Sequence, residues 1–167
     1  MTALKCLLIL STAFAATSDL RAIQVAVHVE PVDLHGPRHL EDQSQAAVIR
    51  DYLHAWQSFR AALGQNQPEL LGVDFVGSAR DKLAGTVKQQ AELGIRTQYQ
   101  DRSHDLQILF YSPEGLSIEL ADKVEYDVQI IDHDKIVTTQ RQSARYLVVL
   151  TPAEVRWKVR VFQSVPE

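Results

Sequence analysis

The feature that most constrains the fold is a long alternating stretch, Leu116 to Ile131. Apolar residues occupy the even positions from 116 to 130 with one exception, and most of the odd positions are polar or charged. Strict alternation of this kind predicts a single long strand with one buried face and one solvated face. The exception is Asp122, a carboxylate at a position where the pattern places an apolar side chain.

Two interpretations of Asp122 follow from the pattern. In the first, residues 121–123 form a bend or bulge that divides the strand and leaves the carboxylate in water. In the second, Asp122 faces a pocket inside the protein. Asp is common in turns and bends, and here it stands beside the charged Lys123. We therefore favour the bend.

The region before this strand has helical patterns. Asp42 and Gln45 resemble a capping box, and Gly64 is suited to end a helix that spans residues 42–63. A shorter segment follows at 68–76, and a further helix is expected at 78–93, closed by Gly94. The first helix carries an apolar stripe at helical spacing: Ile49, Tyr52, Leu53, Trp56, Phe59 and Leu63.

From residue 106 onward the pattern changes to that of strands. A turn at 112–115 pairs Ile108 with Leu120 and Phe110 with Ile118. A four-residue loop at 151–154 leads into a strand over 155–162 and pairs Val148 with Trp157 and Tyr146 with Val159. Tyr146 and Val148 should lie on the same buried face as the even-numbered residues of the long strand. This requires an odd number of residues in the loop of the turn near His133. The resulting register places Asp127 opposite Arg141 and Asp122 opposite Tyr146.

This order of elements resembles the nuclear transport factor two-like (NTF2-like) superfamily, which includes ketosteroid-isomerase-like and polyketide-cyclase-like proteins. The resemblance covers about Asp42 to Phe162 and rests on element order, without a diagnostic motif. It implies an α+β fold in which N-terminal helices pack on a strongly curved antiparallel sheet of about four to five strands. The open end of such a cone is often a ligand pocket. The superfamily contains enzymes, binding modules and adaptors, so the resemblance does not decide function.

The N-terminus has the pattern of an export signal. Lys5 precedes an apolar run, and Ala13-Phe14-Ala15 provides a small-x-small cleavage site. The run has about ten apolar residues, whereas a membrane span needs ~20, so we expect no stable membrane insertion. We therefore predict a signal peptide at 1–15, an N-terminal arm or edge strand at 16–40, one domain at 41–167, and a periplasmic or extracellular location. Cleavage would remove Cys6 and exclude disulfides.

Charge and motifs exclude several functions. The formal charge of -4 argues against nucleic-acid binding, and no phosphate loop or G-x-S-x-G motif points to a cofactor or a nucleophile. His28, His35 and His39 are metal-ligand types, but no regular element fixes their geometry, so we predict no metal site. We interpret Asp132-His133-Asp134 as a turn.

The expected register gathers polar residues on the sheet face toward the helices. A few polar groups in an apolar cavity suit a small-molecule site. Equally, these side chains could simply bond to one another. The residues we assign to the pocket are Trp56, Tyr126, Gln140, Gln142 and Trp157, together with Asp122 and Tyr146.

The leading hypothesis is an exported, non-enzymatic module that binds a small apolar ligand or a protein partner. The alternative is a ketosteroid-isomerase-like or cyclase-like enzyme with Asp122 as base and Tyr146 or Tyr126 as hydrogen-bond donor. His104 and Asp105 could form an acid–base pair at the cone mouth, although loop polarity explains them equally well.

The opposite sheet face suggests a third function. Leu147 and Val149 lie there among basic residues that include Arg156, Lys158 and Arg160. This mixed surface is suited to a homodimeric adaptor. The interpretation as an ordinary monomer surface explains the same residues equally well.

Overall fold

The computed structural model describes residues 25–32 and 38–166. The predicted signal peptide at 1–15 lies outside the described residues, as do residues 33–37 between the arm and the first helix. The elements, in chain order, are β1 (Ala26–Val29), α1 (Asp42–Gln65), the 3-10 helix η1 (Pro68–Val73), α2 (Gly77–Glu92), β2 (Ile95–Tyr111), β3 (Ile118–Asp132), β4 (Lys135–Pro152) and β5 (Trp157–Val165).

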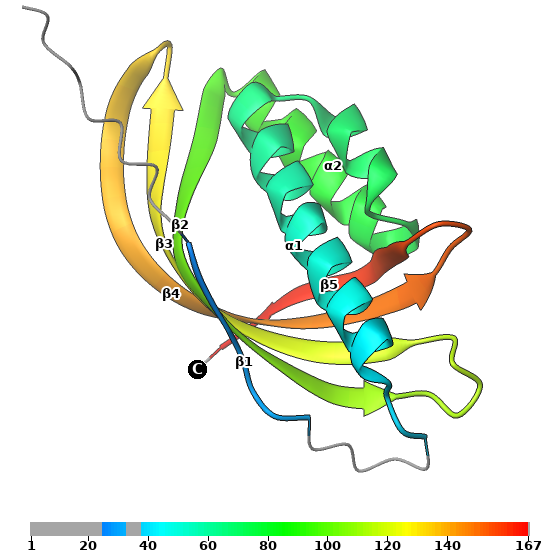
Figure 1. The fold of residues 1–167 in the computed structure, drawn as a ribbon. Coiled ribbons are helices and arrows are strands. Elements are labelled where there is room, and N and C mark those ends of the chain that lie inside the picture. Colours follow the sequence, from blue (N-terminus) through cyan, green and yellow to red (C-terminus); the bar gives the residue numbers. More distant parts are fainter. Residues whose placement is uncertain (1–24, 33–37, 167) are drawn as a thin grey trace, which may run out of the picture.

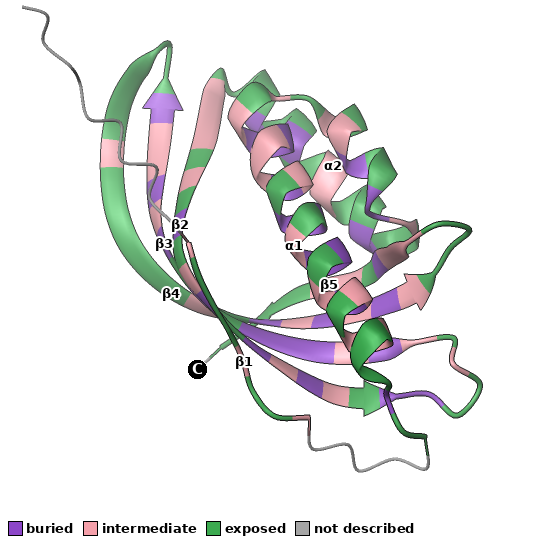
Figure 2. Cartoon of the chain, viewed as in Figure 1, coloured by how far each residue is buried: buried purple, intermediate pink, exposed green. Residues whose placement is uncertain are grey.

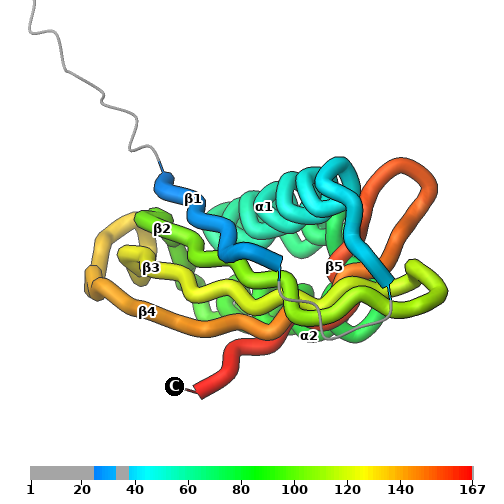
Figure 3. The backbone as a smooth tube through the Cα atoms, turned by 60° about the horizontal axis from the view of Figure 1, so that its bottom comes forward, coloured from blue at the N-terminus to red at the C-terminus, as the bar shows by residue number. Residues whose placement is uncertain are grey.

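The helices cover one face of a strongly curved sheet, and α1 runs along its concave side (Figure 1). The predicted α+β fold is confirmed. The five strands lie in the order β1-β2-β3-β4-β5. Figure 3 shows β1 at one margin of the sheet, where it pairs with β2 in parallel, with Ala26 opposite Ser103. The sheet is therefore mixed, whereas the sequence predicted an antiparallel one. In the described part of the chain, neither helix has an apolar stretch of membrane-spanning length.

The core lies between α1 and the inner sheet face, where buried residues concentrate (Figure 2). Of the predicted helix stripe, Tyr52, Trp56, Phe59 and Leu63 are buried, because their spacing places them on the side of α1 that faces the strands. Burying each such side chain stabilises the fold by roughly 1.5–3 kcal/mol. Trp56 is the largest fully buried residue, and it occupies the middle of the interface.

The end of α1 differs from the prediction. The helix continues two residues past the expected terminus, and Asn66, with φ 55°, takes the left-handed position that we assigned to Gly64. Asparagine tolerates this conformation. Its side-chain Nδ2 also donates a 3.0 Å hydrogen bond to the carbonyl of Ile95, which ties the helix end to β2. At the start of the helix, Glu41 is the cap residue and makes no side-chain cap bond, so the predicted capping box is wrong.

The β2–β3 hairpin confirms one predicted pair and corrects another. Ile108 lies opposite Leu120, as expected. A bulge between Ile108 and Phe110 then places Phe110 opposite Glu119. The extra residue turns Phe110 to the outer face, where it is 38% exposed. The predicted Phe110–Ile118 pair is therefore wrong.

The β3–β4 register is as predicted, although the turn is not. Asp122 lies opposite Tyr146 and Asp127 opposite Arg141. The turn has two residues, His133 and Asp134, with φ of 44° and 66°, which is the geometry that favours two-residue hairpins. The expected odd loop length is wrong, because a bulge after Ile130 supplies the extra residue and restores the register.

The β4–β5 register differs from the prediction. Pairing continues to Pro152 opposite Trp157, and the turn follows at 153–156, two residues later than expected. Val148 therefore lies opposite Phe162 and Tyr146 opposite Ser164. Val155, which the sequence analysis placed at the start of the last strand, is 87% exposed in this turn.

Candidate functional site

Asp122 is fully buried and lies in an uninterrupted strand. One of its oxygens, Oδ2, accepts a 2.6 Å hydrogen bond from the Tyr52 hydroxyl and lies 2.7 Å from Nδ1 of His104. The even numbering of Asp122 gives it the inward direction of its apolar neighbours, as the alternation requires. The bend that we favoured from the sequence is wrong, and Asp122 belongs to a polar network inside the core.

His104 lies at the centre of this network. Its ring is 1% exposed and meets the Trp56 ring edge to face, with centroids 5.2 Å apart. Its Nε2 lies 3.9 Å from Oδ2 of Asp101, which in turn pairs with Arg60 at 2.5 Å. Asp105 is exposed on the other face of β2, so the suggested His104–Asp105 pair is wrong.

A bulge in β2 makes this arrangement possible. Asp101 and His104 are three positions apart, and a regular strand would place them on opposite faces. The register shift between Asp101 and Ser103 inserts one extra residue, and both side chains then face α1.

The two carboxylates favour a charged imidazole. Burial lowers the pKa of His104, but hydrogen bonds and charge from Asp101 and Asp122 outweigh it and raise the pKa to about 9. Burial raises the pKa of Asp101, but hydrogen bonds from His104 and Trp56 and the Arg60 charge outweigh burial and hold this pKa below its usual range. Burial and the Asp122 charge raise the pKa of Tyr52 well above normal, so Tyr52 stays protonated and donates. The network therefore contains two cations and two anions.

Two cavities adjoin this network. The inner cavity has a volume of about 110 Å³ and is lined by Leu53, Trp56, Asp101 and His104, with Val25 and Val27 on the β1 side. A groove of about 530 Å³ lies between α1 and β2, lined by residues that include Ala61, Gly64, Gln98 and Tyr99. Gln57 and Arg60 line both, so these two side chains lie between the groove and the inner cavity.

Known structures share this architecture. The intermembrane-space region of the chloroplast protein ARC6 superposes with a TM-score of 0.62 at 13% identity, over 78% of this chain and 100% of that one. A candidate scytalone dehydratase from Novosphingobium aromaticivorans gives 0.52 at 12% identity, over 75% of this chain and 89% of the other. A protein from Catenulispora acidiphila, solved in complex with S-DNPA, gives 0.50 at 13% identity, over 72% and 93%.

The fold is NTF2-like. The resemblance found in the element order is thus confirmed at the level of the fold, which is all that identities this low show. No protein-family model and no curated protein matches the sequence. In this NTF2-like cone, the candidate site has to be assigned from its own geometry.

The NTF2-like cone separates the other predicted pocket residues. Tyr126 is buried, its ring lies 5.0 Å from that of Tyr99 in the groove, and its hydroxyl donates a 3.4 Å hydrogen bond to Gln142. Gln142 and Gln140 are exposed and contact each other at 3.4 Å. Tyr146, opposite Asp122, stacks on Phe162 with centroids 4.8 Å apart. Trp157 lies at the start of β5, where its backbone N–H donates to Asp51.

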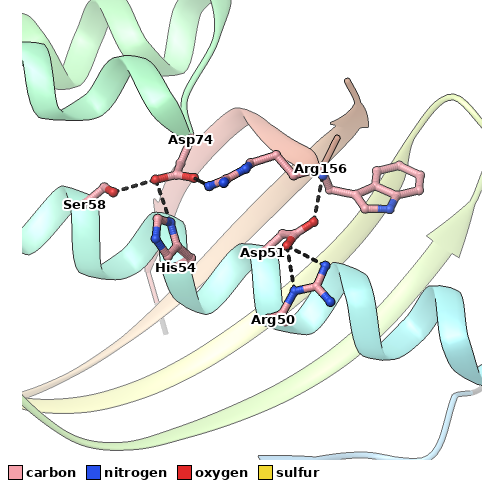
Figure 4. Close-up of polar contacts among 7 residues, drawn as sticks. Arg50, Asp51, His54, Ser58, Asp74 and Arg156 are labelled. Carbon is pink, nitrogen blue, oxygen red and sulfur yellow. Dashed lines mark hydrogen bonds and ion pairs between the residues drawn. The ribbon is translucent and has the colours of Figure 1, made fainter. Parts of the chain in front are cut away.

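A second polar cluster surrounds Asp74, which follows η1 (Figure 4). Its carboxylate is fully buried and accepts hydrogen bonds from Ser58 at 2.5 Å and Arg156 at 3.1 Å, and it contacts His54 at 2.9 Å. Ser58 and His54 meet the same carboxylate oxygen, so the three residues do not form a nucleophile–base–acid chain. The cluster fastens α1 to the η1 corner and to the β4–β5 turn. Arg156, predicted to lie on the outer sheet face, takes part in this contact.

Sequence reasoning missed several partners in both clusters. Tyr52 was identified only as an apolar stripe residue, and Asp101 was not assigned a role. The signal that could have found the Tyr52 contact is the pairing of a hydroxyl on the buried helix stripe with the one carboxylate on the buried strand face. Among the described residues, no group of three or more His, Cys, Asp or Glu side chains is placed to hold a metal ion.

Proposed function

We propose that this protein binds a small, largely apolar molecule in the groove between α1 and β2, without catalysing a reaction. The observation that carries the proposal is a groove of about 530 Å³, lined by Tyr99 and the Ala61–Gly64 surface of α1 together with the polar side chains of Gln57, Arg60, Gln65 and Gln98, next to the inner cavity. Small-molecule sites are concave spaces of roughly 300–1,000 Å³ with apolar walls and a few polar groups. Arg60 is the cation at this site.

The surroundings of Asp122 favour binding over catalysis. A general base must reach the proton that it removes, directly or through one water. Asp122 is 0% exposed, and its Oδ2 already receives Tyr52 and His104. It lines neither the groove nor the inner cavity. In the enzyme alternative, a substrate would have to displace Tyr52 or His104 to reach this carboxylate. The opposing Tyr146 packs on Phe162 instead.

The structural neighbours are compatible with a ligand-binding role. One of them, the Catenulispora acidiphila protein, was solved in complex with a small molecule named S-DNPA. This is an analogy at the level of the fold, since the identity is 13%.

The test is a titration with 1-anilinonaphthalene-8-sulfonate, an aromatic anion whose fluorescence rises in apolar surroundings. The native protein should bind it saturably. Ala61→Trp fills the groove from α1 and should weaken binding at least about tenfold, equivalent to about 1.4 kcal/mol. Ala46→Trp is the matched control, because Ala46 is exposed near the other end of the same helix. Equal binding by both variants would reject the groove as the site.

We also propose that the protein is exported after cleavage near Ala15. Support comes from the arrangement of charge, apolar run and small residues at the start of the sequence. N-terminal sequencing of the protein from a periplasmic or culture fraction would give a mature terminus near Ala16 if this is correct. A chain that retains Met1 in the cytoplasmic fraction would reject export.

A second candidate function, homodimer formation through the outer sheet face, gains one specific observation. The bulge that turns Phe110 outward places it in line with Glu119, Val149 and Val161 across neighbouring strands. A row with three apolar members, on a face that carries Leu147 and several charged residues, fits a second copy of the same surface. Light scattering after size exclusion should then give a dimer mass for the native protein and a monomer mass for Phe110→Asp.

A further inference from the structure

Half of β4 has an unpaired edge. β5 pairs with β4 only from Arg145 onward, where Arg145 lies opposite Val165, and Pro166 then has no backbone N–H to continue the ladder. The preceding residues, Lys135 to Ala144, pair with β3 on one side and with no described strand on the other. Figure 1 shows this half of β4 at the margin of the sheet, away from the helices. Its outward backbone N–H and C=O groups are therefore open to another strand.

This edge has few of the features by which proteins block strand addition. Such features are proline, lysine, inward-pointing charges and bulges. Here a bulge at Val137 and the charge of Lys135 protect only the hairpin end. From Thr138 to Ala144 the register is regular, and the sequence contains no proline or glycine. Most of these residues are exposed, so this stretch can accept an extended segment along its length.

The charges of β4 indicate which kind of segment fits the edge. The strand contains Lys135, Arg141 and Arg145 and no carboxylate, in a chain with a formal charge of -4. Arg145 lies directly opposite Lys123 of β3, and like charges at opposite positions destabilise each other. A negative charge added next to this strand would relieve that repulsion.

The carboxylates of β2 and β3 do not neutralise these cations fully. Asp127 lies opposite Arg141 and also pairs with Arg102, so one carboxylate serves two guanidinium groups. The outer strip beside the edge has more cations than carboxylates: Arg102, Lys123, Arg141 and Arg145 against Asp105, Glu125 and Asp127. The edge is therefore positively charged although the chain as a whole is negative.

We propose that the free edge of β4, from Thr138 to Ala144, binds an extended acidic segment of a partner protein as an added strand. Backbone hydrogen bonds hold such a segment, and its alternate side chains select it. Carboxylates on one face meet Arg141 and Arg145, and uncharged polar side chains on the other face meet the exposed Gln140 and Gln142. A second copy of β4 fits less well, because it adds only cations. This site shares no residue with the groove between α1 and β2, so it stands apart from the proposed function.

The experiment is a nuclear magnetic resonance titration of the ¹⁵N-labelled protein with two capped peptides. One alternates threonine with glutamate, and the other alternates threonine with lysine, so the sign of the charge is the main difference. The glutamate peptide should cause saturable shifts of the backbone amide signals from Thr138 to Ala144 and should slow their hydrogen exchange. It should bind at least about tenfold more tightly than the lysine peptide, which corresponds to about 1.4 kcal/mol.

Charge reversal tests the two arginines. Arg141→Glu combined with Arg145→Glu should abolish the preference for the glutamate peptide. The matched control is Lys82→Glu combined with Lys88→Glu, which changes the net charge equally at two exposed positions of α2 and should keep the preference. The comparison of the two peptides uses the native protein, so it decides the matter even if the reversed variant does not fold.

Three results would overturn the proposal. Equal binding of the two peptides would remove the acidic partner, and the absence of saturable shifts along β4 would remove the site. Shifts from Thr138 to Ala144 that appear on raising the protein concentration alone would show that a second copy occupies the edge. Binding of anilinonaphthalene in the groove has no bearing on these outcomes, so failure here and failure of the proposed function are distinguishable.

Discussion

The Tyr52 hydroxyl on α1 donates a 2.6 Å hydrogen bond to the Asp122 carboxylate on β3, and this bond joins the long helix to the middle of the sheet. Both side chains are fully buried. Hydrogen bonds to charged groups contribute about 1.5–3 kcal/mol, more than neutral ones. The contact therefore helps to hold α1 against the sheet.

Replacing Tyr52 by Phe should lower the free energy of unfolding by about 1.5–3 kcal/mol, because Asp122 loses a donor inside the core. The measurement is urea denaturation followed by circular dichroism. Tyr126→Phe is the control: its hydroxyl makes a longer, 3.4 Å contact to the exposed Gln142, and the loss should stay below about 1 kcal/mol. Similar losses in both variants would mean that the Tyr52–Asp122 bond adds little.

Stability should fall at alkaline pH because of His104. Its pKa in the folded protein, about 9, lies above the ordinary value of 6.5, so the protonated ring stabilises the fold. That contribution is complete below about pH 6.5 and is lost as the pH rises through about 9, a change of roughly 3 kcal/mol. Denaturant titrations between pH 6 and 10 measure it. His104→Gln should remove this slope, and Tyr52→Phe should retain it. A flat profile in the native protein would contradict a charged His104.

The bulge in β2 places Ile108 and Phe110 on opposite faces of the sheet, so we predict different losses of stability when each is replaced by Ala. Ile108 is 1% exposed, and Ile108→Ala should lower the unfolding free energy by about 2–5 kcal/mol through the cavity that it leaves. Phe110 is 38% exposed, and Phe110→Ala should lower the unfolding free energy by less than about 1 kcal/mol. Urea unfolding of the two variants distinguishes this arrangement from a regular hairpin. In a regular hairpin, both residues would share the inner face and both substitutions would be costly.

Much of the fold was predictable because its alternation and helix spacing are regular. The even-numbered face of β3 and the helix stripe follow directly from those periods. Matching the apolar faces of β3 and β4 then gave the Asp122–Tyr146 pair, although the turn assumed for it was wrong. The bulges near Phe110, Val137 and Arg102 were not predictable. One extra residue changes the sheet face to which a side chain points, and it leaves no mark in the amino-acid composition. The late β4–β5 turn was missed because Val155 has the side chain of a strand residue and the backbone of a turn.

The candidate site was predictable only in part. The sequence singled out Asp122 and Trp56, and it favoured a bend because the local pattern beside Lys123 contains no information about the helix. Tyr52 and His104 lie 70 and 18 residues away from Asp122 in the chain. The Tyr52 contact depends on helix docking and the His104 contact on the pairing of β2 with β3, and both are tertiary features.

The most direct test of the binding proposal is to map, residue by residue, where a small apolar ligand contacts the protein. Backbone amide signals in ¹H–¹⁵N spectra can be followed as 1-anilinonaphthalene-8-sulfonate is added. We predict saturable shifts at Ala61, Gly64, Gln98 and Tyr99, which line the groove between α1 and β2. Shifts confined to the outer sheet face around Phe110, or no saturable shifts, would contradict a binding site in this groove.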